Sequence, residues 1–234
     1  MINGVCKCPK DTYENNNGTC ILNPCKYIKL QIQNPRYTQQ ANELKGKTGL
    51  KKEFGYKQNK DGSQTTLTET NGGHSLKIPI DRSTVGYMHT HIDDFLNGDI
   101  DKKTGEPLMD KPIRMFSPQD ILKFLHIIKN TKYNSVPIHL VYATMISSKG
   151  NYTLRFTGDV NFSTSHIKTA EEYKEDFTKY FTKKYKNNTE KAFLHFLKDF
   201  IKVDGVNLYR LRDNGDIEKK TLKANGKVAT NDCE

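Results

Sequence analysis

The sequence predicts a mixed α/β (α+β) fold, in which a mixed β-sheet is flanked by helices. Three observations predict it. Apolar, β-branched runs over residues 85–91, 137–146 and 151–156 are typical of strands. Apolar residues with helical spacing follow Ser117, and aromatic residues recur at helical spacing between 170 and 201. The chain has 234 residues, which is enough for one sizeable core and a small appendage.

We expect three segments along the chain. They are residues 1–26, a cysteine-rich disulfide knot or the end of an upstream module; residues 27–165, the core of the fold; and residues 166–234, a helical extension with a terminal β-hairpin.

The cysteines are unevenly placed: Cys6, Cys8, Cys20 and Cys25 crowd the first 25 residues, and Cys233 is next to last. Their crowding predicts disulfides among the first four, and hence an oxidising compartment, secreted or in the cell envelope. Zinc binding by these cysteines is less favoured, since no Cys-x-x-Cys pair occurs. Cys233 has no obvious partner. No signal peptide is visible, although an internal start at Met1 would hide one.

The first half of the core segment reads as short elements separated by turns. The alternation over 27–32 predicts a short strand or extended linker, and Pro35 opens a polar helix to about Lys45. An Asp-Gly turn at 61–62 then predicts a hairpin between residues 51–57 and 64–68. Short strands over 76–80 and 85–91 follow.

Residues 92–115 are polar, acidic and broken by Gly and Pro, so we expect a loop beside the site that acts as a lid or in substrate recognition. The pair Asp99 and Asp101 is reminiscent of a calcium loop, but the remaining ligand spacing fails.

The second half of the chain alternates between strand and helix patterns. A helix is expected from Ser117 to about Asn130, followed by paired strands over 137–146 and 151–156, with His139 as a sheet residue. Two helices with aromatic core stripes follow between 170 and 201. A terminal hairpin turns at Asn214-Gly215.

The formal net charge is +10, spread over the whole chain, which favours a solvated Lys-rich surface. An anionic partner such as an envelope polymer or membrane surface is the weaker alternative. Nucleic acid is not favoured, since acidic residues interrupt the basic helices. No apolar run approaches ~18 residues, so no membrane span is predicted.

The most informative stretch is His89-Thr90-His91 together with Ser117-Pro118-Gln119-Asp120. Residues two apart on a strand point to the same face, so both imidazoles can reach one ion. Asp120 lies at the start of a predicted helix and would be the third ligand. Three ligands and an open fourth position are how a catalytic zinc is held.

Each part has a plainer interpretation. Ser117, Pro118 and Asp120 make an ordinary helix start, with Ser at the N-cap, Pro at the first helical position and an acid at N3. His89 and His91 could be ordinary residues of a half-buried strand. Their co-occurrence favours the metal site, because capping does not require a His-x-His on the preceding strand.

The combination resembles the JAB/MPN zinc metalloprotease family, whose JAMM motif is a strand Glu, His-Ser/Thr-His and Ser-x-x-Asp. The nearest group is that of bacterial secreted or toxin-type domains, and the resemblance covers roughly residues 36–160. The chain departs from the pattern twice. Ile92 stands where the family usually has Pro, and residues 92–116 separate the two parts of the motif.

The resemblance implies an enzyme that hydrolyses a peptide or isopeptide bond in a protein or peptide substrate. Zinc would be held by His89, His91 and Asp120, and Glu53 would be the general base in preference to Glu43 and Glu69. Ser117 would donate to the oxyanion. Asp93 or Asp94 would orient a ligand imidazole. The alternative is a non-catalytic MPN-like or basic module that binds a protein or an anionic polymer.

Overall fold

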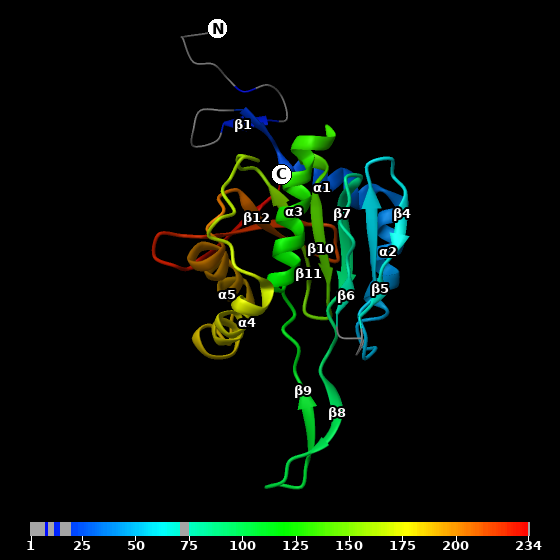
Figure 1. The fold of residues 1–234 in the computed structure, drawn as a ribbon, viewed down its shortest axis with the longest axis vertical. Helices are drawn as coiled ribbons and strands as arrows, with labels where there is room; N and C mark the ends of the chain where they lie inside the picture. The colour runs from blue at the N-terminus through cyan, green and yellow to red at the C-terminus, as the bar shows by residue number, and fades with distance from the viewer. Residues whose placement is uncertain (1–7, 9–11, 15–19, 71–74, 234) are drawn as a thin grey trace.

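An eight-stranded mixed sheet forms the centre of the molecule, with the strand order β14-β13-β12-β11-β10-β7-β3-β4 (Figure 1). The structure is a computed structural model and describes residues 8, 12–14, 20–70 and 75–233. The strands are β3 (Gly55–Asn59), β4 (Gln64–Thr66), β7 (Thr84–Thr90), β10 (Tyr142–Ile146), β11 (Asn151–Phe156), β12 (Val206–Leu211), β13 (Ile217–Leu222) and β14 (Val228–Asp232). β7 and β10 run parallel and the other neighbours antiparallel. The predicted mixed α/β class is confirmed.

Helices cover both faces of the sheet. α1 (Pro24–Gln33) and α2 (Pro35–Lys45) pack on one face, and α3 (Pro118–Asn134), α4 (Ala170–Lys179) and α5 (Thr189–Phe196) pack on the other. Successive strand residues point to opposite faces, so Tyr87 belongs to the core under α3 whereas Met88 belongs to the core under α2. We call these the α3 face and the α2 face of the sheet.

The C-terminal segment continues the same sheet. β12 pairs with β11 along its whole length, and β13 and β14 follow as a meander. The aromatic stripes of the two predicted helices lie in the core under α3, as predicted. π-helical turns at Tyr180–Lys184 and Leu197–Ile201 extend α4 and α5. Residues 166–234 therefore share both sheet and core with residues 27–165.

Residues 92–115 form a β-hairpin rather than the expected irregular loop. β8 (Phe95–Ile100) pairs with β9 (Pro107–Asp110), and this arm projects away from the body (Figure 1). Arg114 fixes its base, since the guanidinium lies 3.2 Å from Asp93 and 2.5 Å from Asp94. The large exposed apolar side chains of the arm are Leu96, Ile100, Leu108 and Met109.

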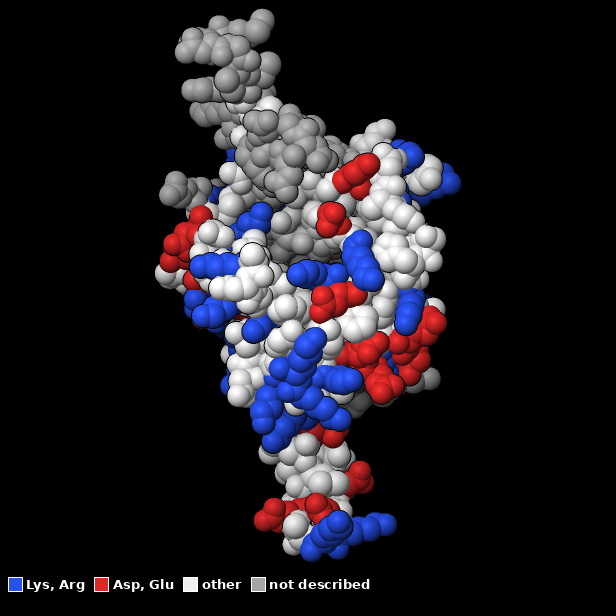
Figure 2. Space-filling model, turned by 90° about the vertical axis from the view of Figure 1, so that its left-hand side faces the viewer, with Lys and Arg blue, Asp and Glu red and all other residues white. Residues whose placement is uncertain are grey.

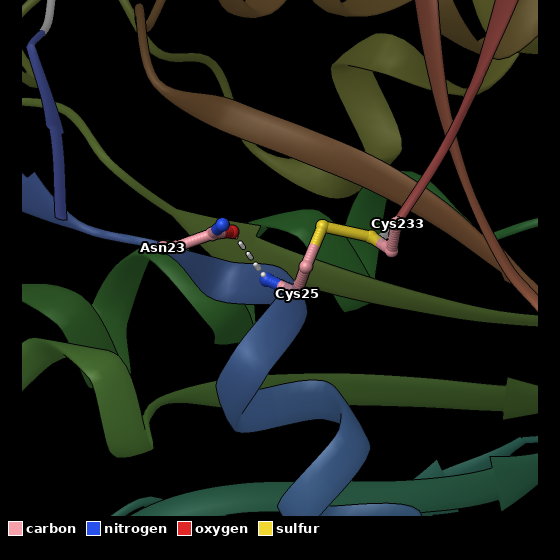
Figure 3. The surroundings of a disulfide bond; sticks show 3 residues. All are labelled: Asn23, Cys25 and Cys233. Atoms are coloured by element: carbon pink, nitrogen blue, oxygen red, sulfur yellow. Dashed lines mark hydrogen bonds between the residues drawn. A yellow bond between two sulfur atoms is a disulfide. The ribbon is translucent and has the colours of Figure 1, made fainter. Parts of the chain in front are cut away.

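Two disulfides connect four of the five cysteines. Cys8 is bonded to Cys20, beside the small hairpin of β1 (Thr12–Glu14) and β2 (Cys20–Leu22). Cys25 is bonded to Cys233, so the expectation that Cys25 pairs within the N-terminal group is wrong, and Cys233, whose partner was not obvious from the sequence, bridges to that group (Figure 3). Cys6 lies outside the described residues. The bond joins the start of α1 to the C-terminal end of the sheet. The two disulfides are consistent with an oxidising environment.

Two strand predictions fail at helix starts. Residues 27–32 lie in α1, because Asn23 caps the helix by accepting from the Cys25 amide (Figure 3) and Pro24 stands in its first turn. His139 lies in a short 3₁₀ turn, Ile138–Leu140, before β10 begins. The remaining small strands, β5 (Thr68–Glu69) and β6 (Leu76–Lys77), form a separate pair.

Within the described residues, no helix combines the length and apolar character needed to cross a membrane. Charges of both signs lie on the side of the body shown in Figure 2, where a group of Lys and Arg residues borders acidic residues above the arm.

Candidate functional site

β7 brings the two histidines to one point on the α3 face. His89 is its penultimate residue and His91 follows its end, and both side chains are buried. The two Nε2 atoms lie 3.0 Å apart. The predicted i, i+2 placement therefore brings both imidazoles to the same position.

Glu53 reaches this pair from the segment just before β3, the antiparallel neighbour of β7. Gly55 pairs with His89, and Phe54 and Thr90 exchange hydrogen bonds, so continuing the register brings Glu53 opposite His91. Glu53, His89 and His91 each offer a ligand atom within 4.8 Å of the others. Glu53 precedes β3 by two residues, so its expected position inside a strand is wrong.

Glycine is required at Gly55 for this close approach. A Cβ on Gly55 would come within 2.6 Å of the Met88 carbonyl oxygen and 2.9 Å of the His89 Cβ. A larger residue would push β3, and Glu53 with it, away from the imidazoles.

Asp120 approaches the pair from the start of α3. Its Oδ1 lies 3.3 Å from His89 Nε2 and its Oδ2 lies 3.5 Å from His91 Nε2. Ser117 is the N-cap and holds this carboxylate, since its backbone amide and its hydroxyl donate to Oδ2 at 2.7 and 2.8 Å. The Ser117 hydroxyl also accepts from the Asp120 amide, which completes a capping box. The helix start thus also positions a site carboxylate.

These spacings suit a small divalent cation. Ligand atoms at ~2.0–2.2 Å from a tetrahedral ion lie ~3.3–3.6 Å from one another. The two Nε2 atoms lie 3.0 Å apart, slightly closer than this, and Asp120 Oδ1 and Oδ2 lie 3.3 Å from His89 and 3.5 Å from His91, respectively. The group whose single ligand atoms all lie within 4.8 Å of one another is Glu53, His89 and His91. Two imidazoles and a carboxylate are also a ligand set that first-row metals accept.

Two further contacts orient the ligand groups. His91 Nδ1 lies 3.0 Å from the Ile113 carbonyl oxygen, and this hydrogen bond leaves Nε2 free to point into the site. The Tyr87 hydroxyl donates to the Asp120 carbonyl oxygen at 2.7 Å and ties the start of α3 to β7. His89 Nδ1 is buried and has no hydrogen-bond partner in the described part of the chain.

The electrostatics favour positive charge between these groups. Burial would raise the pKa of Asp120, but the two imidazoles hold it well below its usual value. Burial would lower the pKa of His91, but the hydrogen bond with Asp120 and the charge of Glu53 raise it to about 9. Carboxylates thus stabilise a cationic His91 imidazole, and the same negative field would stabilise a metal ion.

Other residues named from the sequence lie away from the imidazoles. The suggestion that Asp93 or Asp94 orients a ligand imidazole is wrong, because both carboxylates bind Arg114 and the Ile113 carbonyl takes that role. Glu69 is exposed and lies 3.8 Å from the Lys52 ammonium group. Glu43 binds Lys47 and Tyr56.

The roles of Tyr87, Gly55 and the Ile113 carbonyl at the site were not predicted from the sequence. Tyr87 carried a usable signal, because it stands two residues before His89 and therefore on the same face of the strand. The carbonyl of Ile113 carried none, since its position depends on how the arm returns to the body.

Comparisons of this chain with protein-family models, with curated proteins and with solved structures gave no significant match.

Proposed function

We propose that the protein is a zinc-dependent hydrolase of JAB/MPN type that cleaves a peptide or isopeptide bond. The observation that carries the proposal is the convergence of Glu53, His89 and His91, whose ligand atoms lie within 4.8 Å of one another, with the Asp120 carboxylate 3.3 and 3.5 Å from the two imidazoles. The proposal also rests on the resemblance of these residues to the JAMM motif.

Three residues are the proposed metal ligands, and hydrogen bonds hold two of them in place. His89, His91 and Asp120 would hold the ion, and zinc bound there supplies a Lewis acid that lowers the pKa of water toward ~7. The hydrogen bond from Ser117 to Asp120 and the one between His91 and the Ile113 carbonyl hold two ligands in place. Ligands fixed in this way need little rearrangement during the reaction.

Glu53 is the proposed general base. Its carboxylate is close to both imidazoles, but it comes from a different element than Asp120, so it can accept a proton without leaving a helix cap. It would take a proton from the attacking water and pass it to the leaving amine.

Ser117 is proposed to donate to the carbonyl oxygen of the substrate as negative charge develops there. Its hydroxyl donates to Asp120 Oδ2, so this role requires the hydroxyl to rotate. The Ser117 amide still donates to the carboxylate after such a rotation and keeps Asp120 in place.

The arm offers a surface for the substrate. Both ends of the arm connect along the chain to site residues. β8 begins shortly after His91, and β9 is followed by Ile113 and Ser117. An extended segment of a protein substrate lying along its exposed apolar side chains would be led toward the imidazoles.

Metal analysis combined with a turnover assay tests the proposal. Protein purified without chelator should contain about one zinc per chain and should cleave a member of a peptide and isopeptide panel. Protein that cannot be loaded with zinc would overturn the proposal. Protein that binds zinc but cleaves nothing would instead be a binding module.

A matched pair of glutamates tests the assignment of the base. Glu53→Gln keeps the shape but cannot take a proton, so turnover should fall ~10²-fold or more while zinc is retained. Glu69→Gln, on an exposed glutamate, should leave turnover unchanged. The opposite result would identify Glu69 as the base.

A further inference from the structure

On the α2 face of the sheet, a row of polar side chains runs across four strands. Tyr142 of β10 and Gln58 of β3 are both register partners of Gly86, and Gln58 also pairs with Gln64 of β4. A Cβ on Gly86 would lie 2.4 Å from the Tyr142 ring, so the ring extends over this glycine, and its hydroxyl donates to Gln58.

Arg155 of β11 stands at the end of this row and is buried, with 4 % of its surface exposed. Its guanidinium lies 5.4 Å from the centre of the Tyr142 ring and donates to the carbonyl oxygens of His139 and Val141 and to the side chain of Gln31. Within the described residues, no carboxylate lies within ion-pair distance of Arg155. Burial lowers its pKa to about 10.

A buried cation without an anionic partner is costly, since carbonyl oxygens and aromatic rings compensate only part of its lost hydration. Other buried cations of this chain have a carboxylate: Lys57 binds Asp81, and Lys220 lies near Glu190 and Glu218. Arg155 is therefore the exception among these three, because no anion is among its described contacts.

A hollow of about 400 Å³ lies next to the guanidinium, between the sheet and the two N-terminal helices. Arg36 and Lys60 line it together with Arg155, and no Asp or Glu is among its lining residues. Tyr27, Tyr37 and Tyr142 supply aromatic wall. The hollow is thus positively charged and partly apolar.

Three buried polar atoms of this hollow lack a hydrogen-bond partner among the residues that the structure describes. They are Arg155 Nε, Asn59 Oδ1 and Gln64 Oε1. Buried polar groups are nearly always paired, so three such atoms in one hollow indicate groups that a ligand would satisfy.

We propose that this hollow binds a small organic anion, a carboxylate or a phosphate ester, with its charged group on Arg155. The anion supplies the partner that the guanidinium lacks and accepts from Nε. Hydroxyl or amino groups of the ligand donate to Asn59 and Gln64, and its carbon skeleton packs on the tyrosines. This site is separate from His89 and His91, which lie on the opposite face of the sheet.

Three probes that share one ring test the proposal by calorimetric titration: benzoate, phenyl phosphate and neutral benzyl alcohol. At least one anion should bind saturably, and the alcohol should bind at least tenfold more weakly. Whichever anion binds more tightly identifies the carboxylate or the phosphate ester as the natural group.

Arg155→Met should weaken that anion's binding about tenfold or more, the loss expected for a charged hydrogen bond. Arg82→Met, which removes an exposed arginine outside the hollow, should change it less than twofold. The double variant Arg36→Met, Lys60→Met should also weaken binding, and it decides the question if Arg155→Met does not fold. Any phenyl phosphate that binds at His89 and His91 would still bind in the Arg155 variant and in the double variant.

Two results would overturn the proposal. One is the absence of saturable binding of either anion to the wild-type protein. The other is anion binding of equal strength in the wild type and in the variants of Arg155 or of Arg36 and Lys60.

Discussion

The two faces of the central sheet differ in what surrounds their buried basic side chains. On the α3 face, His89 and His91 lie beside two carboxylates, Glu53 and Asp120. On the α2 face, Arg155 is buried to the same degree but is surrounded by carbonyl oxygens and tyrosines. The first arrangement suits a metal cation, and the second suits an anion.

Part of the difference comes from the helices that cover the two faces. α3 begins with a capping box whose acid faces the sheet, so it contributes negative charge. α1 contributes Gln31 and no acid to the contacts of Arg155. Since a strand supplies both faces with side chains alternately, the covering helix adds to the charge that distinguishes one face from the other.

The largest expected effect tests whether the two faces are independent. Zinc at 1,000 times its dissociation constant should raise the free energy of unfolding by about 4 kcal/mol in the wild type. This increment should vanish in His91→Ala and Asp120→Asn and should remain in Arg155→Met. Denaturant unfolding with and without zinc measures it. Loss of the increment in Arg155→Met would show that the faces are coupled.

The second effect concerns the helix that covers Arg155. Replacing both Cys25 and Cys233 with Ser should lower the free energy of unfolding by about 3 kcal/mol, a typical value for a disulfide. It should also weaken anion binding, because α1 is no longer bonded to the C-terminal strand region. Zinc content should not change, and a parallel loss of zinc would contradict the separation of the faces.

A matched pair of buried tyrosines sharpens the comparison. Tyr87→Phe removes the hydrogen bond to the Asp120 carbonyl on one face, and Tyr37→Phe removes a 2.9 Å bond to Thr144 on the other. Each should cost about 1 kcal/mol of stability in thermal or denaturant unfolding. Tyr87→Phe alone should also weaken zinc binding, because the Tyr87 hydroxyl holds the start of α3. Equal zinc affinities would mean that Tyr87 has only a structural role.

The smallest effect asks whether a buried cation in this sheet needs a carboxylate. Lys57 is buried and lies 2.5 Å from Asp81, whose side chain is half exposed. Asp81→Asn leaves Lys57 buried without a carboxylate, as Arg155 is. It should lower the free energy of unfolding by about 1 kcal/mol or less at neutral pH, since an ion pair with an exposed partner is screened by solvent. If Asp81→Asn leaves the free energy of unfolding unchanged, a buried cation in this sheet does not need a carboxylate, and this argument for an anion at Arg155 is lost.

The pH dependence of the same pair has a defined sign. Burial would raise the pKa of Asp81, but Lys57 and Ser83 lower it below its ordinary value near 3.8. The stability from this pair is therefore present above about pH 4 and declines as pH falls below it. Asp81→Asn should lack that part of the acid-dependent loss in unfolding measured between pH 5 and 2.

Strands and helix starts could be predicted from local sequence patterns where their structure depends on one element alone. The two-residue spacing of His89 and His91 predicts that they share a face of β7, and the capping pattern predicts where α3 starts. Glu53 is different, because its placement depends on the β3–β7 register and it lies outside the strand itself. The sequence suggested the residue only through its resemblance to a family.

Three features were hidden for physical reasons. Apolar alternation over residues 27–32 suggested a strand. The cap at Asn23 starts a helix there instead, and only Ile28 of that stretch is buried. The arm has an exposed strand pattern without apolar alternation, which resembles a loop in the sequence. The partner of Cys25 is 208 residues away, and disulfide connectivity cannot be deduced from sequence.

The bond between Cys25 and Cys233 makes a covalent ring of nearly the whole molecule. A single cut by a protease in the arm opens this ring but releases no fragment, because the two pieces stay joined through sulfur. Such a nicked molecule keeps its intact mass in a non-reducing gel and separates into two chains only after reduction. The ring also prevents the oxidised chain from passing end-first through a pore that admits a single strand.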